Sequence, residues 1–157
     1  MNPPSSPTYF TVEEAGRMLP LVQRIVADIT RLFAEIHDRR ERVNQIRAAS
    51  GGQRNEESVY SEELRQVEQE IEKEATRLDG FLAELRELGV ELKDPVHGLV
   101  DFRARMDDRD VYLCWKLGEE EIGHWHEIDA GFSGRQSLLE NSATGPDDSD
   151  NGDGAGC

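Results

Sequence analysis

The sequence predicts an α+β fold: a long antiparallel helical hairpin, coiled-coil-like, packed at its base on a small three- to four-stranded antiparallel sheet. Two observations predict the helices: apolar residues recur every three or four positions over residues 20–49, and they do so again over residues 57–88. A third predicts the sheet. Four short segments rich in β-branched and aromatic residues follow the helices, and brief polar connections separate them.

The first helix has a defined start. Thr11 and Glu14 have the spacing of a capping box, in which each side chain accepts a hydrogen bond from the other residue's backbone N–H. Pro20 then interrupts the pattern, because proline disfavours helical backbone at the residue before it. We therefore expect a short helix over residues 12–18 and a long one from Pro20 to about Ala49. A single kinked helix is the alternative.

The apolar seams of the two long helices can be aligned with each other. In an antiparallel hairpin, the residue numbers of two facing residues add up to a constant. A sum of 107 places the two apolar seams opposite each other, beginning with Val22 opposite Leu85. Arg39, the polar residue of the first seam, then faces Glu68. This alignment predicts a hairpin with its turn in the polar, glycine-rich segment 50–55.

Charge bears on both the fold and the partners. Residues 12–48 carry seven basic and six acidic side chains, whereas residues 54–88 carry five and eleven, so the helices are complementary. The whole chain has a net charge of -15 and lacks the clustered Lys and Arg that bind phosphates. No apolar run approaches the roughly 20 residues of a membrane span, and the start has no signal-peptide pattern. With only two cysteines, we expect a cytoplasmic protein that binds neither nucleic acid nor membrane.

Composition divides the chain into three parts. Residues 1–9 form a Pro- and Ser-rich flexible arm, and residues 10–136 form a single domain made of the helical hairpin 11–89 and a β-meander 90–136. Residues 137–157 have five acidic and no basic side chains, which indicates a disordered acidic tail. Strands are expected at residues 90–93, 99–104, 111–117 and 122–128.

Asp101 is the most unusual residue of the predicted sheet. It lies within an apolar strand, so it must either sit at an edge or have a partner. Lys116, His126 or Arg135 could supply that partner. A structural ion pair is favoured over catalysis, because such pairs are common without any chemistry.

The two histidines of the last predicted strand form a candidate metal site. His124 and His126 are two positions apart, so their side chains share a face, and Asp101, Cys114 or Glu127 could complete a ligand set. Two ligands on one strand fall short of the usual three or four. The alternative is that both histidines are ordinary, partly buried residues.

Three further features have a structural interpretation that is favoured over a functional one. Cys114 has no nearby cation in sequence, so a buried structural cysteine is favoured over a reactive thiolate. Trp115 and Trp125 lie on neighbouring strands, where aromatic pairing is favoured over a ligand platform. The segment 131–135 has the glycines and arginine of an anion-binding loop, but a turn that folds Phe132 onto the sheet is favoured.

These segments together resemble a known family. Residues 98–102, 111–119 and 125–135, with the Phe10-Thr11 start, resemble an uncharacterised bacterial family, domain of unknown function 2203, over about residues 9–137. The resemblance implies a small bacterial cytosolic protein without an established activity. The matching positions are Asp101, Phe102, Cys114, Trp115, Gly118, Trp125, His126, Gly131, Phe132, Gly134 and Arg135. The family pattern is more often aromatic at position 124, which weakens the paired-histidine site.

Two functions follow as hypotheses. The favoured one is a protein-interaction or scaffold domain, whose hairpin contacts a protein partner or a second copy in a four-helix bundle. The alternative is a small-molecule- or metal-binding domain centred on Asp101, His126 and Arg135. Its other candidate residues are Cys114, Trp115, Trp125 and Glu127. No catalytic residue, reaction or cofactor follows from the sequence, and whether the protein is an enzyme stays open.

Overall fold

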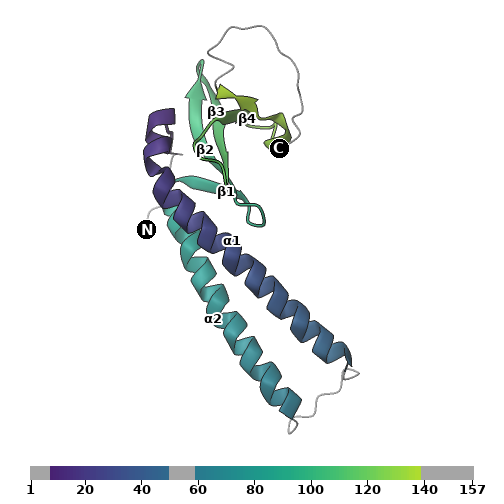
Figure 1. Ribbon diagram of the computed structural model, residues 1–157. Coiled ribbons are helices and arrows are strands. Elements are labelled where there is room, and N and C mark those ends of the chain that lie inside the picture. The colour runs from purple at the N-terminus through teal and green to yellow at the C-terminus, as the bar shows by residue number, and fades with distance from the viewer. Residues whose placement is uncertain (1–7, 50–58, 139–157) are drawn as a thin grey trace.

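A computed structural model describes residues 8–49 and 59–138. Three predicted segments lie outside the described residues: residues 1–7 of the arm, the turn between the helices, and the acidic tail from residue 139. The elements are, in chain order, α1 (Val12–Ala49), α2 (Val59–Glu87), β1 (Val90–Asp94), β2 (Leu99–Met106), β3 (Arg109–Lys116), β4 (His124–Glu127), the 3₁₀ helix η1 (Phe132–Gly134) and β5 (Gln136–Ser137). Figure 1 shows two antiparallel helices with the sheet at one end, which confirms the predicted α+β fold.

The start of α1 is capped as predicted. The Thr11 backbone N–H donates to Glu14 Oε1 at 3.0 Å, and the Glu14 N–H donates to Thr11 Oγ1 at 3.0 Å. Phe10, just before the cap, is buried and its ring meets Phe102 of β2 edge-on, with 5.3 Å between centroids. The cap therefore starts the helix and also anchors it on the sheet.

The predicted helix break at Pro20 is wrong, and α1 continues through this residue. Pro20 is exposed, whereas Leu19 and Val22 beside it are buried in one core. A proline inside a helix removes one hydrogen bond and crowds the preceding turn. Burial of the flanking apolar residues, from Ala15 onward, offsets this cost and holds the helix together.

The helices pair in a different register from the predicted one. Arg39 forms an ion pair with Glu74 at 3.4 Å, not with Glu68, which pairs with Arg47 instead. The index sums of these pairs are 113 and 115, close to one heptad beyond 107. A heptad seam matches itself again after a shift of seven residues, so apolar spacing alone cannot separate the two registers.

Two hydrophobic clusters follow one another along the hairpin. Far from the sheet, a small distal cluster is formed by the buried residues Ile36, Val43 and Ile71. Near the sheet, the basal core joins both helices to one face of the strands. Its buried members are Phe10, Ala15, Leu19, Val22, Ile25, Val26, Ile29, Leu85, Val90, Val100, Phe102, Ala104, Val111, Leu113, Trp115, Ile122 and Trp125. Neither described helix is apolar enough over a sufficient length to cross a bilayer.

The sheet is an antiparallel meander in the order β1-β2-β3-β4-β5. The fifth strand, β5, was not predicted, because two residues are too few to show a strand pattern. β2 and β3 are joined through Asp107 and Asp108 alone, both with positive φ, where the sequence suggested a longer connection. Gly89, just after α2, also has positive φ, and a Cβ there would lie 2.8 Å from Thr8 Cβ.

The two faces of the sheet differ in chemistry. Alternate residues of β2 and β3 point to the basal core, among them Phe102 and Leu113, which are opposite each other. The intervening residues belong to the other face, which we call the outer face. They include Asp101, opposite Cys114, and Tyr112, opposite His126. The buried polar residues Asp101 and His126 therefore lie on the side away from the helices.

Candidate functional site

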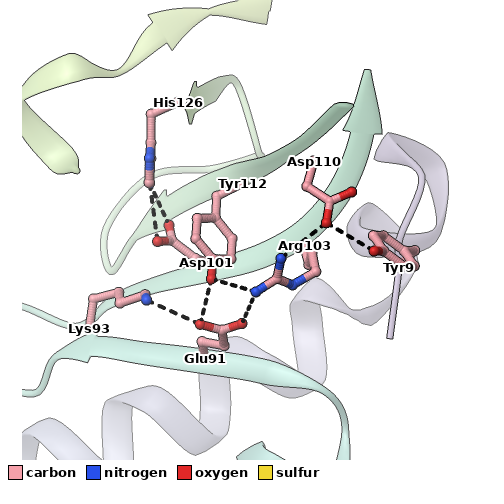
Figure 2. Close-up of polar contacts among 8 residues, drawn as sticks. All are labelled: Tyr9, Glu91, Lys93, Asp101, Arg103, Asp110, Tyr112 and His126. Carbon is pink, nitrogen blue, oxygen red and sulfur yellow. Dashed lines mark hydrogen bonds and ion pairs between the residues drawn. The ribbon is translucent and has the colours of Figure 1, made fainter. Parts of the chain in front are cut away.

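A buried acid–histidine pair lies on the outer face. Asp101 comes from β2 and His126 from β4, on the two sides of β3. His126 Nε2 lies 3.1 Å from each carboxylate oxygen of Asp101, and the two residues are 3% and 2% exposed. Figure 2 shows the imidazole pointing directly at the carboxylate. Of the partners considered from the sequence, His126 is the one that Asp101 contacts.

The second nitrogen of His126 defines the protonation of the pair. Nδ1 lies 2.7 Å from the backbone oxygen of Glu127, which can only accept, so Nδ1 carries a proton. A second proton must then lie between Nε2 and the carboxylate of Asp101, because two acceptors do not bond to each other. The pair is neutral overall wherever that proton resides. Burial raises the pKa of the Asp101 carboxyl, and the adjacent His126 opposes this rise.

Cys114 completes a three-residue cluster. It is fully buried on β3, and its Sγ, a carboxylate oxygen of Asp101 and a ring nitrogen of His126 all lie within 4.8 Å of one another. Burial, followed by the Asp101 charge, raises the pKa of the Cys114 thiol to about 12, although the Arg135 guanidinium works in the opposite direction. The thiol is therefore protonated at neutral pH. It is not an activated nucleophile, and His126, with both nitrogens engaged, is not its base.

The segment between β4 and β5 adds a buried cation beside the cluster. The side chain of Arg135 is only 4% exposed, and its Nη2 donates to both carboxylate oxygens of Glu119 at 2.9 and 2.8 Å. Its guanidinium lies 4.5 Å from the ring centre of Phe132. Phe132 in turn lies 5.9 Å from Lys116 Nζ of β3, so the turn folds onto the sheet as expected.

A hydrogen-bonded network covers another part of the outer face and meets the pair through a ring contact. The Tyr112 hydroxyl donates to Glu91 Oε1 at 2.9 Å and accepts from Arg103 Nη2 at 3.1 Å. The Tyr112 ring lies 5.4 Å from that of His126. Burial, followed by Glu91, raises the pKa of the Tyr112 phenol. Figure 2 shows the network continuing from Arg103 to Asp110, which accepts a hydrogen bond from Tyr9, and from Glu91 to Lys93.

Sequence reasoning did not select Tyr112, Glu91 or Arg103 as site residues. The available signal was alternation, since Arg103 is two residues from Asp101 and Tyr112 two residues from Cys114. Residues two apart share a face, so these positions belong to the same surface as the cluster.

The remaining sequence candidates lie elsewhere. Trp115 and Trp125 are buried in the basal core on the other face. Each has an apolar partner in the register, so they do not oppose one another across the strands. Glu127 forms an exposed ion pair with Arg109 at 2.7 Å. His124 lies on the outer face opposite Cys114, but its ring does not belong to the group of converging ligand atoms.

Fold and site together define a class of protein: an α+β domain in which a helical hairpin covers one face of an antiparallel meander, and the other face encloses an Asp–Cys–His cluster. The chain belongs to the family described as uncharacterized conserved protein (DUF2203), which matches residues 8–138. The resemblance seen in the sequence is thus confirmed. No curated protein and no solved structure matches the chain.

Proposed function

We propose that the protein is a small-ligand-binding domain whose site is the cluster of Asp101, Cys114 and His126. The observation that carries the proposal is convergence: three side chains with ligand atoms, from three strands, meet within 4.8 Å and are at most 3% exposed. Burying such groups costs stability relative to apolar residues of similar size. Groups buried in this way are concentrated at functional sites.

Binding fits the cluster better than covalent catalysis. A pKa of about 12 leaves the Cys114 thiol protonated, and both nitrogens of His126 already have partners. The geometry therefore lacks the base and the activated nucleophile that acyl transfer requires. We therefore favour the binding hypothesis, which was centred on Asp101, His126 and Arg135, because the contact between Asp101 and His126 supports it.

Thermal unfolding of the full-length protein tests this proposal. We would compare wild type and Asp101→Asn with Zn²⁺, Mn²⁺, Mg²⁺, inorganic phosphate and malonate as probes. A ligand at about 100 times its Kd stabilises the folded state by about 2.7 kcal/mol, so a binding probe raises Tm. At least one probe should raise the Tm of wild type but not of Asp101→Asn.

Asp110→Asn is the matched control. It removes a carboxylate from the same face that lies outside the cluster and contacts Tyr9 and Arg103. This variant should respond to the probe as wild type does. A panel in which no probe distinguishes wild type from Asp101→Asn would contradict the proposal.

A second candidate function is protein interaction or self-association through the hairpin. It is favoured by the part of α1 and α2 that runs well beyond the sheet in Figure 1, where the described residues form the small distal cluster. A two-helix projection of this kind offers a long surface to a partner or a second copy. Arg40 and Arg42 are exposed on this part of α1.

Analytical ultracentrifugation and affinity capture test the second candidate. The double variant Arg40→Glu with Arg42→Glu reverses two exposed charges on the hairpin without changing the distal cluster. Concentration-dependent association, or a captured protein, should be lost in this variant. A wild-type protein that stays monomeric and captures nothing sensitive to the double variant would exclude the candidate.

A further inference from the structure

We propose that the cluster binds one divalent transition-metal ion of the Zn²⁺ type through an Asp101 carboxylate oxygen, Cys114 Sγ and His126 Nε2. This inference rests on the proposed function and names the ligand class for the same site. Thiolate, imidazole and carboxylate are the donors that proteins use for zinc.

The spacing of the donors fits an ion with little rearrangement. Zinc bonds of about 2.0–2.3 Å in tetrahedral geometry place donor atoms roughly 3.4–3.7 Å apart. His126 Nε2 and the Asp101 oxygens are already 3.1 Å apart, and all three ligand atoms lie within 4.8 Å of one another. The donors therefore need to move by about 1 Å or less, and the ion replaces the proton shared by the acid and the histidine.

The orientation of His126 is already that of a metal ligand. Its Nδ1–H donates to the Glu127 carbonyl at 2.7 Å, which holds the ring and directs Nε2 at the cluster. Metal-ligating histidines usually donate their second N–H to a carbonyl or carboxylate in this way. This contact is independent of the spacing of the three donors and points to the same ligating atom.

The charges balance for one divalent ion. The Asp101 carboxylate and a Cys114 thiolate supply two negative charges. Both form when the ion binds, because binding releases the proton of the Cys114 thiol and the proton shared by Asp101 and His126. Arg135, which lies beside the cluster, is already balanced by its ion pair with Glu119 at 2.8 Å. A buried ion would therefore carry no uncompensated charge.

The donor set also selects among ligands. Sulfur and imidazole donors suit Zn²⁺ and related ions, whereas Ca²⁺ and Mg²⁺ take oxygen ligands. Cys114 is fully buried and its two partners are at most 3% exposed, which suits an ion. Organic ligands usually occupy pockets of about 300–1,000 Å³. Three protein donors leave the fourth position of a tetrahedral ion to water.

Cobalt substitution tests the assignment on the full-length protein. After chelator treatment, we expect one equivalent of Co²⁺ to bind with the visible bands of a tetrahedral ion and a sulfur-to-cobalt charge-transfer band, and Zn²⁺ to displace it. The charge-transfer band reports thiolate ligation in wild type, so this result does not depend on the folding of any variant. Absence of stoichiometric Co²⁺ and Zn²⁺ binding would overturn the inference.

Variants then identify the ligands. Cys114→Ser should lose the charge-transfer band, and Cys114→Ser, Asp101→Asn and His126→Gln should each bind Zn²⁺ at least about 100-fold more weakly, the upper range for loss of an outer-shell contact. Cys157→Ser, which changes the other cysteine, and His124→Gln should bind as wild type does. Loss of binding in either of these controls, or unchanged binding in folded Cys114→Ser, would overturn the three-residue assignment.

The outcome also separates this inference from the function on which it rests. If Zn²⁺ and Co²⁺ do not bind but phosphate or malonate raises the Tm of wild type and not of Asp101→Asn, the metal inference fails and the binding function stands. If no probe binds at the cluster, both fail.

Discussion

Asp101 and His126 neutralise each other in a buried environment, in which either charge alone would be destabilising. Both are almost fully buried, and the Glu127 carbonyl determines which histidine nitrogen faces the acid. A buried pair of this kind adds little stability relative to apolar residues, but removing one partner leaves the other without compensation. Tyr112 packs against the His126 ring and connects the pair to Glu91.

His126→Ala should lower the free energy of unfolding by about 3–5 kcal/mol at neutral pH, because it leaves the Asp101 carboxylate buried and unpaired. Adding Asp101→Asn should recover part of this loss, since an amide costs less to bury than a carboxylate. Urea unfolding of the two single variants and the double variant measures the coupling. Strictly additive effects would show that the two side chains do not act as a pair.

Two carboxylates on the outer face should affect the pH dependence of stability in opposite directions. The pKa of Asp101 is raised above its ordinary value of 3.8 by burial, so its stabilising contribution is fully present below that value and is lost as pH rises through the raised folded pKa. The pKa of Asp110 is lowered by the Tyr9 hydroxyl, so its contribution is present above 3.8 and is lost as pH falls through the lowered folded pKa.

Unfolding free energies of metal-depleted wild type, Asp101→Asn and Asp110→Asn, measured from about pH 3 to pH 7, test these signs, because all other carboxylates cancel in the differences. The wild-type advantage over Asp101→Asn should shrink as pH rises, and that over Asp110→Asn should shrink as pH falls. The same slope for both variants would be inconsistent with the environments described for the two acids.

At the scale of elements, the β2–β3 turn positions the cluster. Because only Asp107 and Asp108 lie between the strands, Asp101 is placed opposite Cys114. Two-residue turns with positive φ at both positions match the twist of a hairpin and specify its register. A slip of one residue would turn Asp101 or Cys114 to the basal core, because neighbouring residues of a strand face opposite ways.

Pro20→Ala should stabilise the protein by about 1–2 kcal/mol, because it restores a hydrogen bond in α1, and the greater freedom of the unfolded alanine variant offsets only part of that gain. Gly80→Ala in α2, where a Cβ meets nothing within 4 Å, calibrates the measurement with an expected gain of about 0.5–1 kcal/mol. Thermal and urea unfolding report both values. A less stable Pro20→Ala protein would mean that α1 needs the local geometry of proline to dock on the sheet.

At the scale of the whole molecule, the base and the distal part of the hairpin differ in how they are packed. Its base supplies the basal core, which covers one face of the sheet and leaves the outer face for polar chemistry (Figure 1). Among the described residues beyond the base, the helices are joined by the distal cluster and by ion pairs such as Arg39 with Glu74. Partly exposed pairs contribute at most about 1 kcal/mol.

Hydrogen exchange should therefore divide the hairpin in two. Backbone amides of residues 36–49 and 64–74 should exchange faster than those of residues 19–29 and 81–85, because the distal part can open without disturbing the basal core. Mass spectrometry of the exchanging full-length protein resolves the two parts. Equal protection along both helices would show that the hairpin opens as a single unit, and it would support an additional contact at the distal end.

Much of this architecture was determined by the sequence alone, because the relevant interactions are local. Thr11 and Glu14 of the capping box are three positions apart, and the heptad seams and alternating strands are read from spacing within one segment. The family relationship and the burial of Cys114 followed from short motifs in the same way.

What only the tertiary structure decided depends on contacts between distant segments. The helix register is degenerate by one heptad, and Pro20 stays helical because a core formed with the sheet holds its neighbours. The site depends on contacts between three strands. Asp101 and His126 meet across β3, 25 positions apart in the chain, and Cys114 joins them only in this strand register. Because one step along a strand reverses a side chain's face, no single segment of the sequence carries that information.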